Sequence, residues 1–319
     1  MIDKNLDPKL GQEDKEIELS LRPKSLAEFI GQKKLKEQLD IFIRAARQRE
    51  EQLDHILFYG PPGLGKITLA LLLAREMGSN IRITSGPALT RAGDLASILT
   101  SLKKGDFLFI DEIHRLSKVV EETLYSAMED YVLDIVLGKG PSARSVRLRL
   151  QKFTIVGATT RIGLISGPMR DRFGYVQQID FYDDENLKEI IKRTAKVLEV
   201  EIEEVAAEEI ARRSRGTPRI ANRLLRRVRD YAQIVSDGKI NLVEAKMALE
   251  KLGVDEMGLS DADRKYLEVV KKQYGGGPVG VENIAAALTE DVGTITDVYE
   301  PFLMKKGLVK RTPKGRVVG

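Results

Sequence analysis

Short apolar runs alternate with helix-like segments between His55 and about Ile179. The runs are Ile56-Leu57-Phe58-Tyr59, Ile81-Arg82-Ile83, Phe107-Leu108-Phe109-Ile110 and Thr154-Ile155-Val156. Apolar runs of this length, bounded by glycines and helical patterns, are typical of a parallel sheet with helices on both faces. The pattern therefore predicts an α/β domain, which we place at residues 19–182.

The hydrophobic periodicity changes after about Asp183. No strand-like run occurs from there to Gly253, and apolar positions from Leu187 to Leu198 recur at helical spacing, which predicts an all-helical domain over residues 183–253. Three helical stretches follow, at about 260–273, 281–288 and 294–305, and then two short strands around Pro313-Lys314-Gly315. This order predicts a winged-helix domain over residues 254–319. Residues 1–18 are polar and aperiodic, so we expect a mobile leader.

Composition excludes several kinds of site. The chain has 319 residues, of which 42% are hydrophobic and 31% charged, enough for a folded core in about two domains, with one or three allowed. It has no cysteine and 2 histidines, which excludes disulfide scaffolds, thiolate zinc sites, cysteine nucleophiles and histidine-rich metal sites. The longest apolar stretches fall far short of the ~20 residues that span a bilayer, and the N-terminus lacks signal-peptide features. We expect a soluble cytoplasmic protein with no membrane partner.

Basic residues are concentrated in two places, although the net charge is only +4. Eight arginines and no acid lie between Arg212 and Arg229, and six basic residues and no acid lie between Lys305 and Gly319. A solvated face or a subunit contact is the usual reason for such a run, and an anionic partner is the other.

The segment Gly60-Pro61-Pro62-Gly63-Leu64-Gly65-Lys66 follows a predicted strand and opens a predicted helix. In a loop of this kind, glycines turn backbone N–H groups onto phosphate oxygens, the helix N-terminus adds its positive dipole, and the lysine reaches the β and γ phosphates. The motif predicts a nucleotide phosphate site.

Two carboxylates, Asp111 and Glu112, directly follow the apolar strand Phe107–Ile110. Ligands bind at the carboxyl edge of parallel strands, so Asp111 would hold Mg²⁺ and Glu112 would orient and deprotonate an attacking water. A hydroxyl of Thr159-Thr160, after the next strand, could contact the γ-phosphate. The cations of Arg170-Asp171-Arg172 are either ion-paired in place or presented to a neighbouring subunit's nucleotide.

The order of these elements resembles the AAA+ ATPases and, within them, the bacterial RuvB family of Holliday-junction branch-migration motors. The resemblance covers about residues 18 to 318. Its motifs are Leu21-Arg22-Pro23, Glu28-Phe29-Ile30-Gly31-Gln32, Gly60 to Lys66, Asp111-Glu112-Ile113-His114-Arg115-Leu116, Gly138-Lys139-Gly140-Pro141-Ser142-Ala143, Gly157-Ala158-Thr159-Thr160-Arg161, Arg170-Asp171-Arg172-Phe173-Gly174, Gly216-Thr217-Pro218-Arg219 and Arg311-Thr312-Pro313-Lys314-Gly315-Arg316.

The resemblance implies a homo-hexameric ring around double-stranded DNA at Holliday junctions, loaded by RuvA and cooperating with the resolvase RuvC. It implies ATP or ADP as the nucleotide, with Mg²⁺. The implied adenine pocket consists of Leu21, Arg22, Ile30 and Tyr182, and the implied phosphate-site residues are Gly63, Gly65, Lys66, Ile67, Thr68 and Arg219. By the same resemblance, Asp111 binds the metal, Glu112 the water and Thr160 the γ-phosphate, while Arg172 reaches the neighbour's nucleotide and Arg311 and Arg316 meet the DNA backbone.

The segment from Tyr131 to Leu150 predicts a β-hairpin. Val132–Leu137 and Arg144–Leu150 flank a Gly-Lys-Gly-Pro-Ser-Ala turn, and apolar Val146, Leu148 and Leu150 alternate with arginines. The resemblance implies that residues 131–150 dock onto RuvA; a purely structural hairpin is the alternative.

One position departs from the family pattern. Ile67 follows Lys66 where the family carries Ser or Thr, and isoleucine offers no oxygen to Mg²⁺. Thr68 is one residue further along the helix and points about 100° away. This raises the hypothesis of a ring scaffold that binds nucleotide but hydrolyses it poorly. A clamp-loader relative is a second alternative, against which the predicted wing and hairpin argue, and a kinase is the least favoured.

Overall fold

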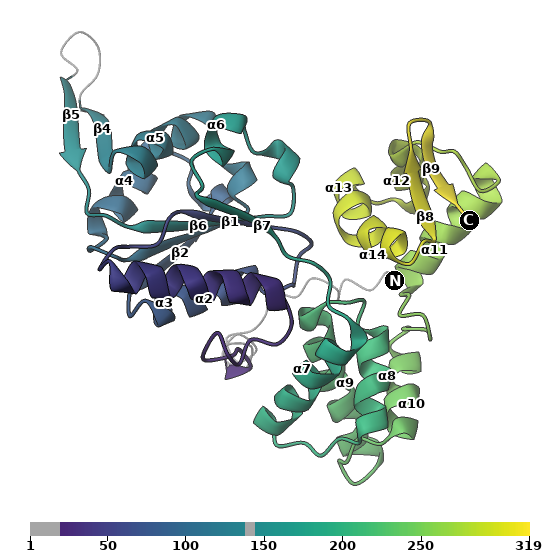
Figure 1. Cartoon of the computed structure of the whole chain (residues 1–319). Helices are drawn as coiled ribbons and strands as arrows, with labels where there is room; N and C mark the ends of the chain where they lie inside the picture. Colours follow the sequence, from purple (N-terminus) through teal and green to yellow (C-terminus); the bar gives the residue numbers. More distant parts are fainter. Residues whose placement is uncertain (1–19, 138–143) are drawn as a thin grey trace.

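The computed structural model describes residues 20–137 and 144–319, which form three successive bodies (Figure 1). The first holds a five-stranded sheet in the order β2-β3-β6-β1-β7 with all strands parallel. The strands are β1 (Ile56–Tyr59), β2 (Ile81–Ser85), β3 (Phe107–Asp111), β6 (Thr154–Thr159) and β7 (Tyr175–Gln178). The predicted α/β domain is confirmed.

Helices cover both faces of this sheet, α2 and α3 on one and α4 to α6 on the other (Figure 1). Their bounds are α2 (Lys33–Gln48), α3 (Lys66–Glu76), α4 (Ala92–Ser101), α5 (Lys118–Glu129) and α6 (Gly167–Arg170), with 3-10 turns η2 (Gly86–Ala88), η3 (Ile113–Arg115) and η5 (Ile162–Leu164). Alternate residues of β3 face opposite layers: Phe107 and Phe109 pack with the α2–α3 side, and Leu108 and Ile110 with the α4–α5 side. Burial on both faces explains why the strand is a continuous apolar run.

The predicted hairpin is present as β4 (Val132–Leu137) and β5 (Arg144–Arg149), which pair antiparallel with Leu133 opposite Leu148. Leu133 is buried against the α4–α5 layer, and Asp134 accepts two hydrogen bonds from Arg147, of 2.8 and 2.9 Å. The turn at 138–143 lies outside the described residues.

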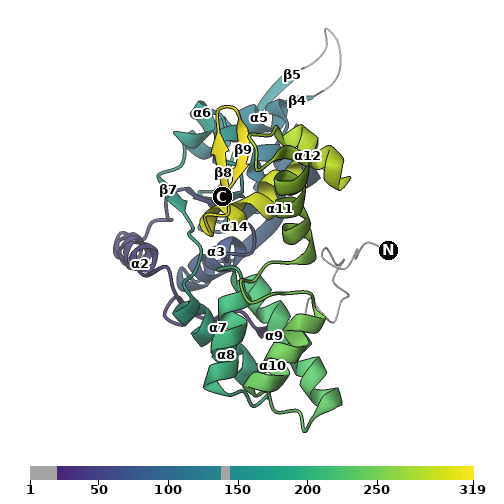
Figure 2. The same cartoon turned by 90° about the vertical axis from the view of Figure 1, so that its right-hand side faces the viewer.

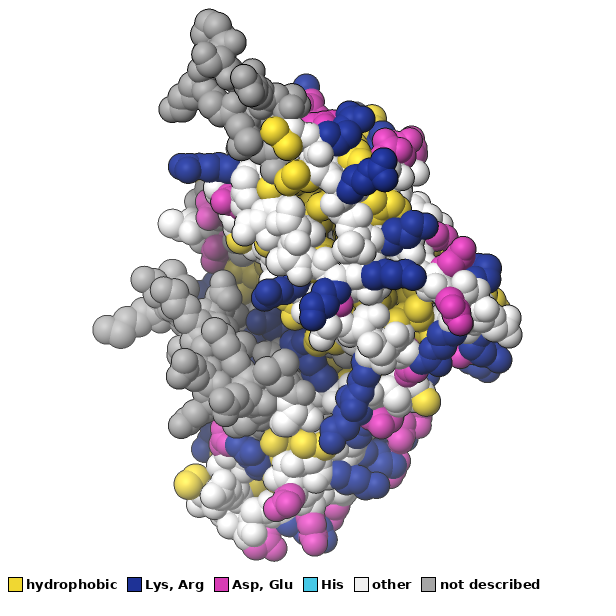
Figure 3. Space-filling view, turned by 90° about the vertical axis from the view of Figure 1, so that its left-hand side faces the viewer, with side chains coloured by type: hydrophobic (Ala, Val, Ile, Leu, Met, Phe, Trp, Pro, Cys, Tyr) yellow, Lys and Arg dark blue, Asp and Glu magenta, His cyan; other side chains and the backbone are white. Residues whose placement is uncertain are grey.

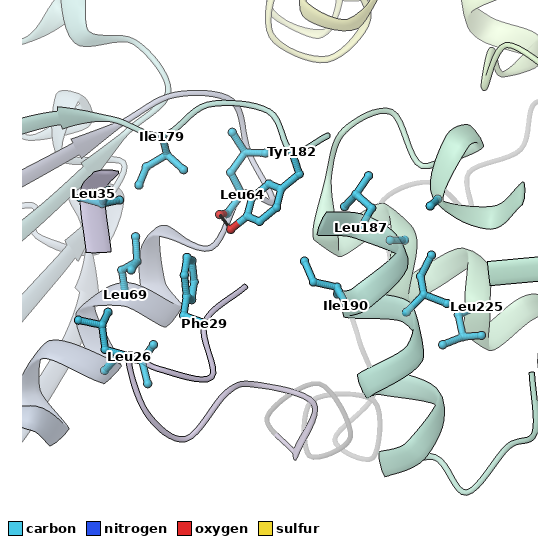
Figure 4. Close-up of a cluster of buried hydrophobic side chains, with 14 of the residues drawn as sticks. Leu26, Phe29, Leu35, Leu64, Leu69, Ile179, Tyr182, Leu187, Ile190 and Leu225 are labelled. Carbon is cyan, nitrogen blue, oxygen red and sulfur yellow. Dashed lines mark hydrogen bonds between the residues drawn. The ribbon is translucent and has the colours of Figure 1, made fainter. Parts of the chain in front are cut away.

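The second body consists of four helices: α7 (Asp184–Val197), α8 (Glu204–Arg213), α9 (Pro218–Val235) and α10 (Leu242–Lys251). Helix α7 begins after Asp183, whose carboxylate accepts from the Asn186 backbone N–H at 2.7 Å, a side-chain N-cap. Its apolar stripe joins the core of the first body. Leu187 and Ile190 lie in one cluster with Phe29, Leu69 and Tyr182 (Figure 4).

The third body has the predicted winged-helix order. Its elements are α11 (Asp261–Tyr274), α12 (Val281–Leu288), α13 (Val292–Thr294), the π-helical turn η6 (Ile295–Tyr299), α14 (Glu300–Lys305), β8 (Val309–Thr312) and β9 (Gly315–Val318). The helix expected over 294–305 is interrupted by η6, so a π-helical turn replaces its first half. The strands β8 and β9 form the wing, which stands in front of the first body in Figure 2. The predicted leader, 1–18, lies outside the described residues.

Internal ion pairs account for the start of the Arg212–Arg229 run. Arg212 and Arg213 bind Glu209, and Arg215 binds Asp263 of α11 at 2.9 Å. On the face shown in Figure 3, Lys and Arg side chains are scattered among acidic and apolar ones. Among the described residues, no helix is both long and apolar enough to cross a membrane.

Candidate nucleotide-binding site

The strand order brings three predicted loops to one edge of the sheet. Strand β6 pairs with β3 on one side and β1 on the other, so the segments after these three strands are neighbours. They carry the two carboxylates (after β3), Thr160 (after β6) and the glycine-rich loop (after β1). The carboxyl edge of a parallel sheet is where α/β proteins bind ligands.

The glycine-rich loop starts at Gly60 with φ of 137°, and a Cβ there would lie 2.4 Å from the Ile179 carbonyl oxygen. Only glycine fits this junction. At the other end of the loop, the Lys66 ammonium donates to the carbonyl oxygens of Gly60 and Pro61, both at 2.8 Å. Burial lowers the pKa of Lys66 to about 8, opposed by the nearby Asp111 charge. The lysine thus sits inside the loop, in the place from which it would meet phosphate oxygens.

Nucleotide affinity should therefore fall as the pH rises above about 8, since phosphate prefers the protonated amine. Bound phosphate raises the lysine pKa again, so binding takes up a proton above pH 8 and none well below it. We expect the Kd for ADP to rise about tenfold per pH unit above the free-state pKa. Titration calorimetry at pH 7.5 to 9.5 measures this. Lys66→Arg, which does not deprotonate, should bind without this slope, and an equal slope in both proteins would contradict the assignment.

Asp111 is the last residue of β3 and is exposed, and Glu112 begins the turn into η3 with φ of 46°. The Glu112 N–H donates to the Asp111 carboxylate at 3.0 Å, and the Glu112 carboxylate accepts from Arg115 at 2.9 Å. A non-glycine residue in the left-handed region is strained, and such positions cluster at functional sites. The turn places the two carboxylates side by side at the sheet edge.

The residues present suit one Mg²⁺ only in part. In the described chain no three acidic or histidine side chains cluster as a metal cage. Mg²⁺ on a nucleotide needs only one or two protein oxygens besides phosphates and waters, and Asp111 supplies one. Ile67 is partly buried and packs against the α2–α3 core, so its side chain adds none.

Thr160 follows Thr159, the last residue of β6, and is half-buried. The Thr159 hydroxyl, 1% exposed with its residue, is 2.9 Å from His114 Nδ1 and accepts from the Arg161 N–H at 2.9 Å. These two bonds fix the backbone on both sides of Thr160. Burial is the main reason that the pKa of His114 is lowered.

The residues predicted to hold adenine lie where the first two bodies meet. Leu21 and Tyr182 are buried, Ile30 packs against the shared core, and Arg22 is half-buried. The Tyr182 ring crosses Gly31, where a Cβ would be 2.7 Å away, and its hydroxyl is 3.4 Å from the Leu64 carbonyl oxygen. A hollow of about 590 Å³ beside this ring is lined by Gly31, Gln32, Lys33, Lys36, Asp180, Phe181, Tyr182, Asp183 and Asn186.

Helix α9 brings Arg219 onto the glycine-rich loop. The Arg219 N–H donates to the Gly63 carbonyl at 3.3 Å, and a Cβ on Gly63, whose φ is 80°, would lie 2.8 Å from Thr217 and 3.0 Å from Arg219 Cβ. A Cβ on Gly65, also in the loop, would lie 3.3 Å from the Phe29 ring. Thr68 is half-buried one residue beyond Ile67 on α3. The glycine-rich loop and helix α9 are therefore in direct contact.

Arg172 lies away from this site, on its own subunit's surface. It donates to Glu129 and to the Pro168 carbonyl, both at 2.8 Å, and its guanidinium lies 4.5 Å from the Tyr125 ring centre. Its side chain is 27% exposed and that of Glu129 is 61% exposed. The sequence left open whether this arginine is ion-paired in place or presented to a neighbouring subunit. In the single subunit it is ion-paired with Glu129.

The predicted DNA-binding arginines also have an internal partner. Arg311 donates to Glu300 at 2.6 Å and Arg316 donates to it at 2.9 Å. Glu300 is completely buried at the start of α14, and the two arginine side chains are 44% and 18% exposed. Lys310 and Lys314, in the wing strands and turn, are exposed as well.

Sequence reasoning did not single out three residues of this region. Arg193 of α7 donates to the carbonyls of Leu21 (2.9 Å) and Glu28 (3.2 Å), which ties the predicted adenine segment to the second body. Lys305 of α14 contacts the Tyr182 carbonyl at 3.3 Å. His114 contacts Thr159. Their partners are backbone carbonyls or a hydroxyl far away in the sequence, so no local pattern indicates these contacts.

Comparison with known proteins covers nearly the whole described chain. Residues 21–179 match the model of the Holliday junction DNA helicase RuvB P-loop domain, 182–255 the RuvB AAA lid domain and 256–319 the RuvB C-terminal winged helix domain. The solved structure of the Thermotoga maritima RuvB Holliday junction branch migration motor is 52% identical, with a TM-score of 0.86 over 94% of this chain and 96% of that one. The structure of an alanine-to-serine mutant of the same protein is 52% identical, with a TM-score of 0.88 over 94% of this chain and 95% of that one.

Proposed function

The chain belongs to the RuvB family of Holliday-junction DNA helicases, and from that premise we propose the roles of its individual residues, its metal and its assembly. It is an ATP-binding AAA+ motor that drives branch migration of Holliday junctions. The scaffold without hydrolysis and the clamp loader are not favoured by this relationship. The observation that carries the mechanism is the meeting of Lys66, Asp111-Glu112 and Thr160 at one sheet edge.

The nucleotide lies between the first two domains in this proposal. Leu21, Arg22, Ile30 and Tyr182 enclose the adenine, and the loop around Gly63 and Gly65, with Thr68 behind it, holds the phosphates. The contact between Gly63 and Arg219 supports this, because an arginine on α9 then faces the same phosphates and senses their loss. Lys66 leaves its carbonyl partners for the β and γ oxygens.

Hydrolysis requires a water aligned on the γ-phosphate. Glu112 accepts the proton of that water, and Thr160 holds a γ oxygen. Asp111 would hold Mg²⁺, which would supply positive charge to the phosphates. Lys66 and Arg219 stabilise the negative charge that spreads over the transferred group. The carboxylates fit these roles because they share a rigid turn at the strand end.

Assembly of subunits brings Arg172 of one subunit to the nucleotide site of its neighbour. We propose a homo-hexamer in which Arg172 reaches the neighbour's nucleotide, exchanging Glu129 for phosphate; both side chains are accessible enough for this exchange. The hairpin of β4 and β5 binds RuvA, and the ring works beside RuvC. The exposed Val146, 37% accessible, supports a role for this hairpin beyond packing.

The wing is proposed to contact the DNA backbone. Arg311 and Arg316 are accessible enough to exchange Glu300 for DNA phosphates, and Lys310 and Lys314 add cations beside them. Backbone contacts of this kind give affinity without reading sequence, which suits a protein that moves along any DNA.

Ile67→Thr is expected to raise the kcat for ATP hydrolysis by about tenfold or more, since a threonine hydroxyl adds the missing metal ligand. The Mg²⁺ concentration for half-maximal rate should fall as well, and ADP affinity without metal should not change. Steady-state hydrolysis across a Mg²⁺ titration measures both. Ile67→Val is the matched control because it changes size without adding oxygen. Equal rates for all three proteins would mean that the metal has another ligand.

A further inference from the structure

We propose that Arg161 is a positioning residue for ATP hydrolysis: its ion pair with Asp297 ties the turn that carries Thr160 to the winged-helix domain. The inference rests on the proposed role of Thr160 at the γ-phosphate. It adds a connection between the nucleotide site and the DNA-binding domain. Arg161 and Asp297 are 136 residues apart in sequence.

The ATPase end of this connection is rigid. Arg161 directly follows Thr160, and its backbone N–H donates to the buried Thr159 hydroxyl at 2.9 Å. That hydroxyl also contacts His114, which belongs to the turn after Asp111-Glu112. Thr160 lies between Thr159 and Arg161, whose positions these bonds fix. A displacement of the Arg161 side chain therefore acts on Thr160.

The winged-helix end is η6. Arg161 Nε donates to the Asp297 carboxylate at 2.8 Å, and Nη2 contacts the same oxygen. The other Asp297 oxygen accepts from the Thr296 hydroxyl at 3.2 Å. Arg161 Nη2 also lies 3.4 Å from where a Cβ on Gly293 would be, so the guanidinium is seated against the α13–η6 segment. π-Helical turns are rare and recur at functional sites.

The same turn contacts the wing. Arg311 donates to the Thr296 carbonyl at 3.2 Å as well as to Glu300. Thr296 and Asp297 are adjacent residues of η6. Thr296 binds Arg311, which is proposed to contact DNA. Asp297 binds Arg161, which follows the proposed γ-phosphate residue. When Arg311 binds a DNA phosphate, η6 loses the hydrogen bond from Arg311 to the Thr296 carbonyl. A change at Thr160 reaches η6 through the ion pair between Arg161 and Asp297.

Stability alone does not explain this pair. The Arg161 and Asp297 side chains are 38% and 33% exposed, and ion pairs so exposed contribute little to folding. Other contacts hold the winged-helix domain in place. Arg215 binds the fully buried Asp263 and lies 4.4 Å from the Phe302 ring centre, and Lys305 contacts Tyr182. Without Arg161 the domain remains docked, and only the turn that carries Thr160 loses its connection to it.

The test is a double-mutant cycle of Arg161→Ala and Asp297→Ala in the full chain, with Asp297→Asn as a milder variant. Kinetics of ATP hydrolysis with and without duplex DNA, ADP affinity and duplex affinity with ADP or a non-hydrolysable ATP analogue are measured. Each single variant should lower DNA-stimulated kcat about tenfold and leave ADP affinity within about twofold, and the double variant should lose no more than either single one. In the single variants, duplex affinity measured with ADP should differ less from duplex affinity measured with the ATP analogue than it does in the unchanged chain.

Two controls distinguish an error in the role of Thr160 from an error in the connection through Arg161 and Asp297. Arg264→Ala removes an arginine of the same 38% exposure from its pair with Asp255 and should change none of these values. If Thr160→Val keeps full kcat, the proposed role of Thr160 is wrong and this inference falls with it. If Thr160→Val is impaired while the two single variants keep their kcat, or their losses multiply in the double variant, the connection is overturned and the proposed function stands.

Discussion

Replacing Arg172 with alanine is expected to lower the kcat for ATP hydrolysis by about 10³-fold or more, the effect of removing an arginine supplied by a neighbouring subunit. ATP affinity of the isolated subunit should hardly change, because Arg172 lies against Glu129 and Tyr125 of its own chain rather than at the phosphate loop. Steady-state kinetics and nucleotide titration below the assembly concentration measure the two quantities.

A mixing experiment shows whether Arg172 acts in trans. Rings made of Arg172→Ala and Glu112→Gln subunits contain some sites with an intact Glu112 and an intact neighbouring arginine. The mixture should recover part of the activity that each variant lacks alone. Arg170→Ala, an exposed neighbour on the same turn, serves as the control and should keep its activity. A large loss of monomer affinity in Arg172→Ala would contradict the assignment.

Glu112→Gln is expected to lower kcat by about 10³-fold while ATP and ADP still bind, since general-base catalysis is lost and the side chain keeps its size. Arg115 can still hydrogen-bond to the amide oxygen, so the strained turn after β3 should persist. Rapid-quench hydrolysis in a single turnover isolates the chemical step, and a fluorescent nucleotide reports binding.

The matched control is Glu122→Gln, which neutralises an exposed carboxylate on α5 that pairs with Lys118. It should leave both kcat and affinity unchanged. If Glu112→Gln retains more than about a tenth of the activity, another group accepts the proton and the role of Glu112 is wrong.

Local pattern was sufficient for the strands that build the site. β1, β3 and β6 are buried on both faces, and their apolar runs are visible in the sequence. β7 was not among the named strands because it is an edge strand whose burial alternates, with polar Gln177 and Gln178. The interruption of the last helical stretch by η6 left no hydrophobic signal either.

Contacts between distant residues were beyond the sequence. The family motif predicted that Arg311 and Arg316 meet DNA, but not that both bind the buried Glu300. A single carboxylate at the start of α14 gives no hint of its partners. In the same way the sequence left open whether Arg172 is ion-paired, and its partner Glu129 lies on another helix. Spacing predicts which loops meet at a sheet edge, but pairing depends on tertiary packing.

The most direct test of the central claim, an ATP-driven motor on Holliday junctions, is branch migration of a synthetic four-way junction by this chain. The assay contains RuvA, the partner proposed above, and Mg²⁺, with ATP, ADP or no nucleotide, and Lys66→Ala as the inactive reference. We expect dissociation of the junction into two duplexes with ATP only, and none with Lys66→Ala. A chain that binds both ATP and the junction, yet leaves the junction intact at every Mg²⁺ concentration, would contradict it.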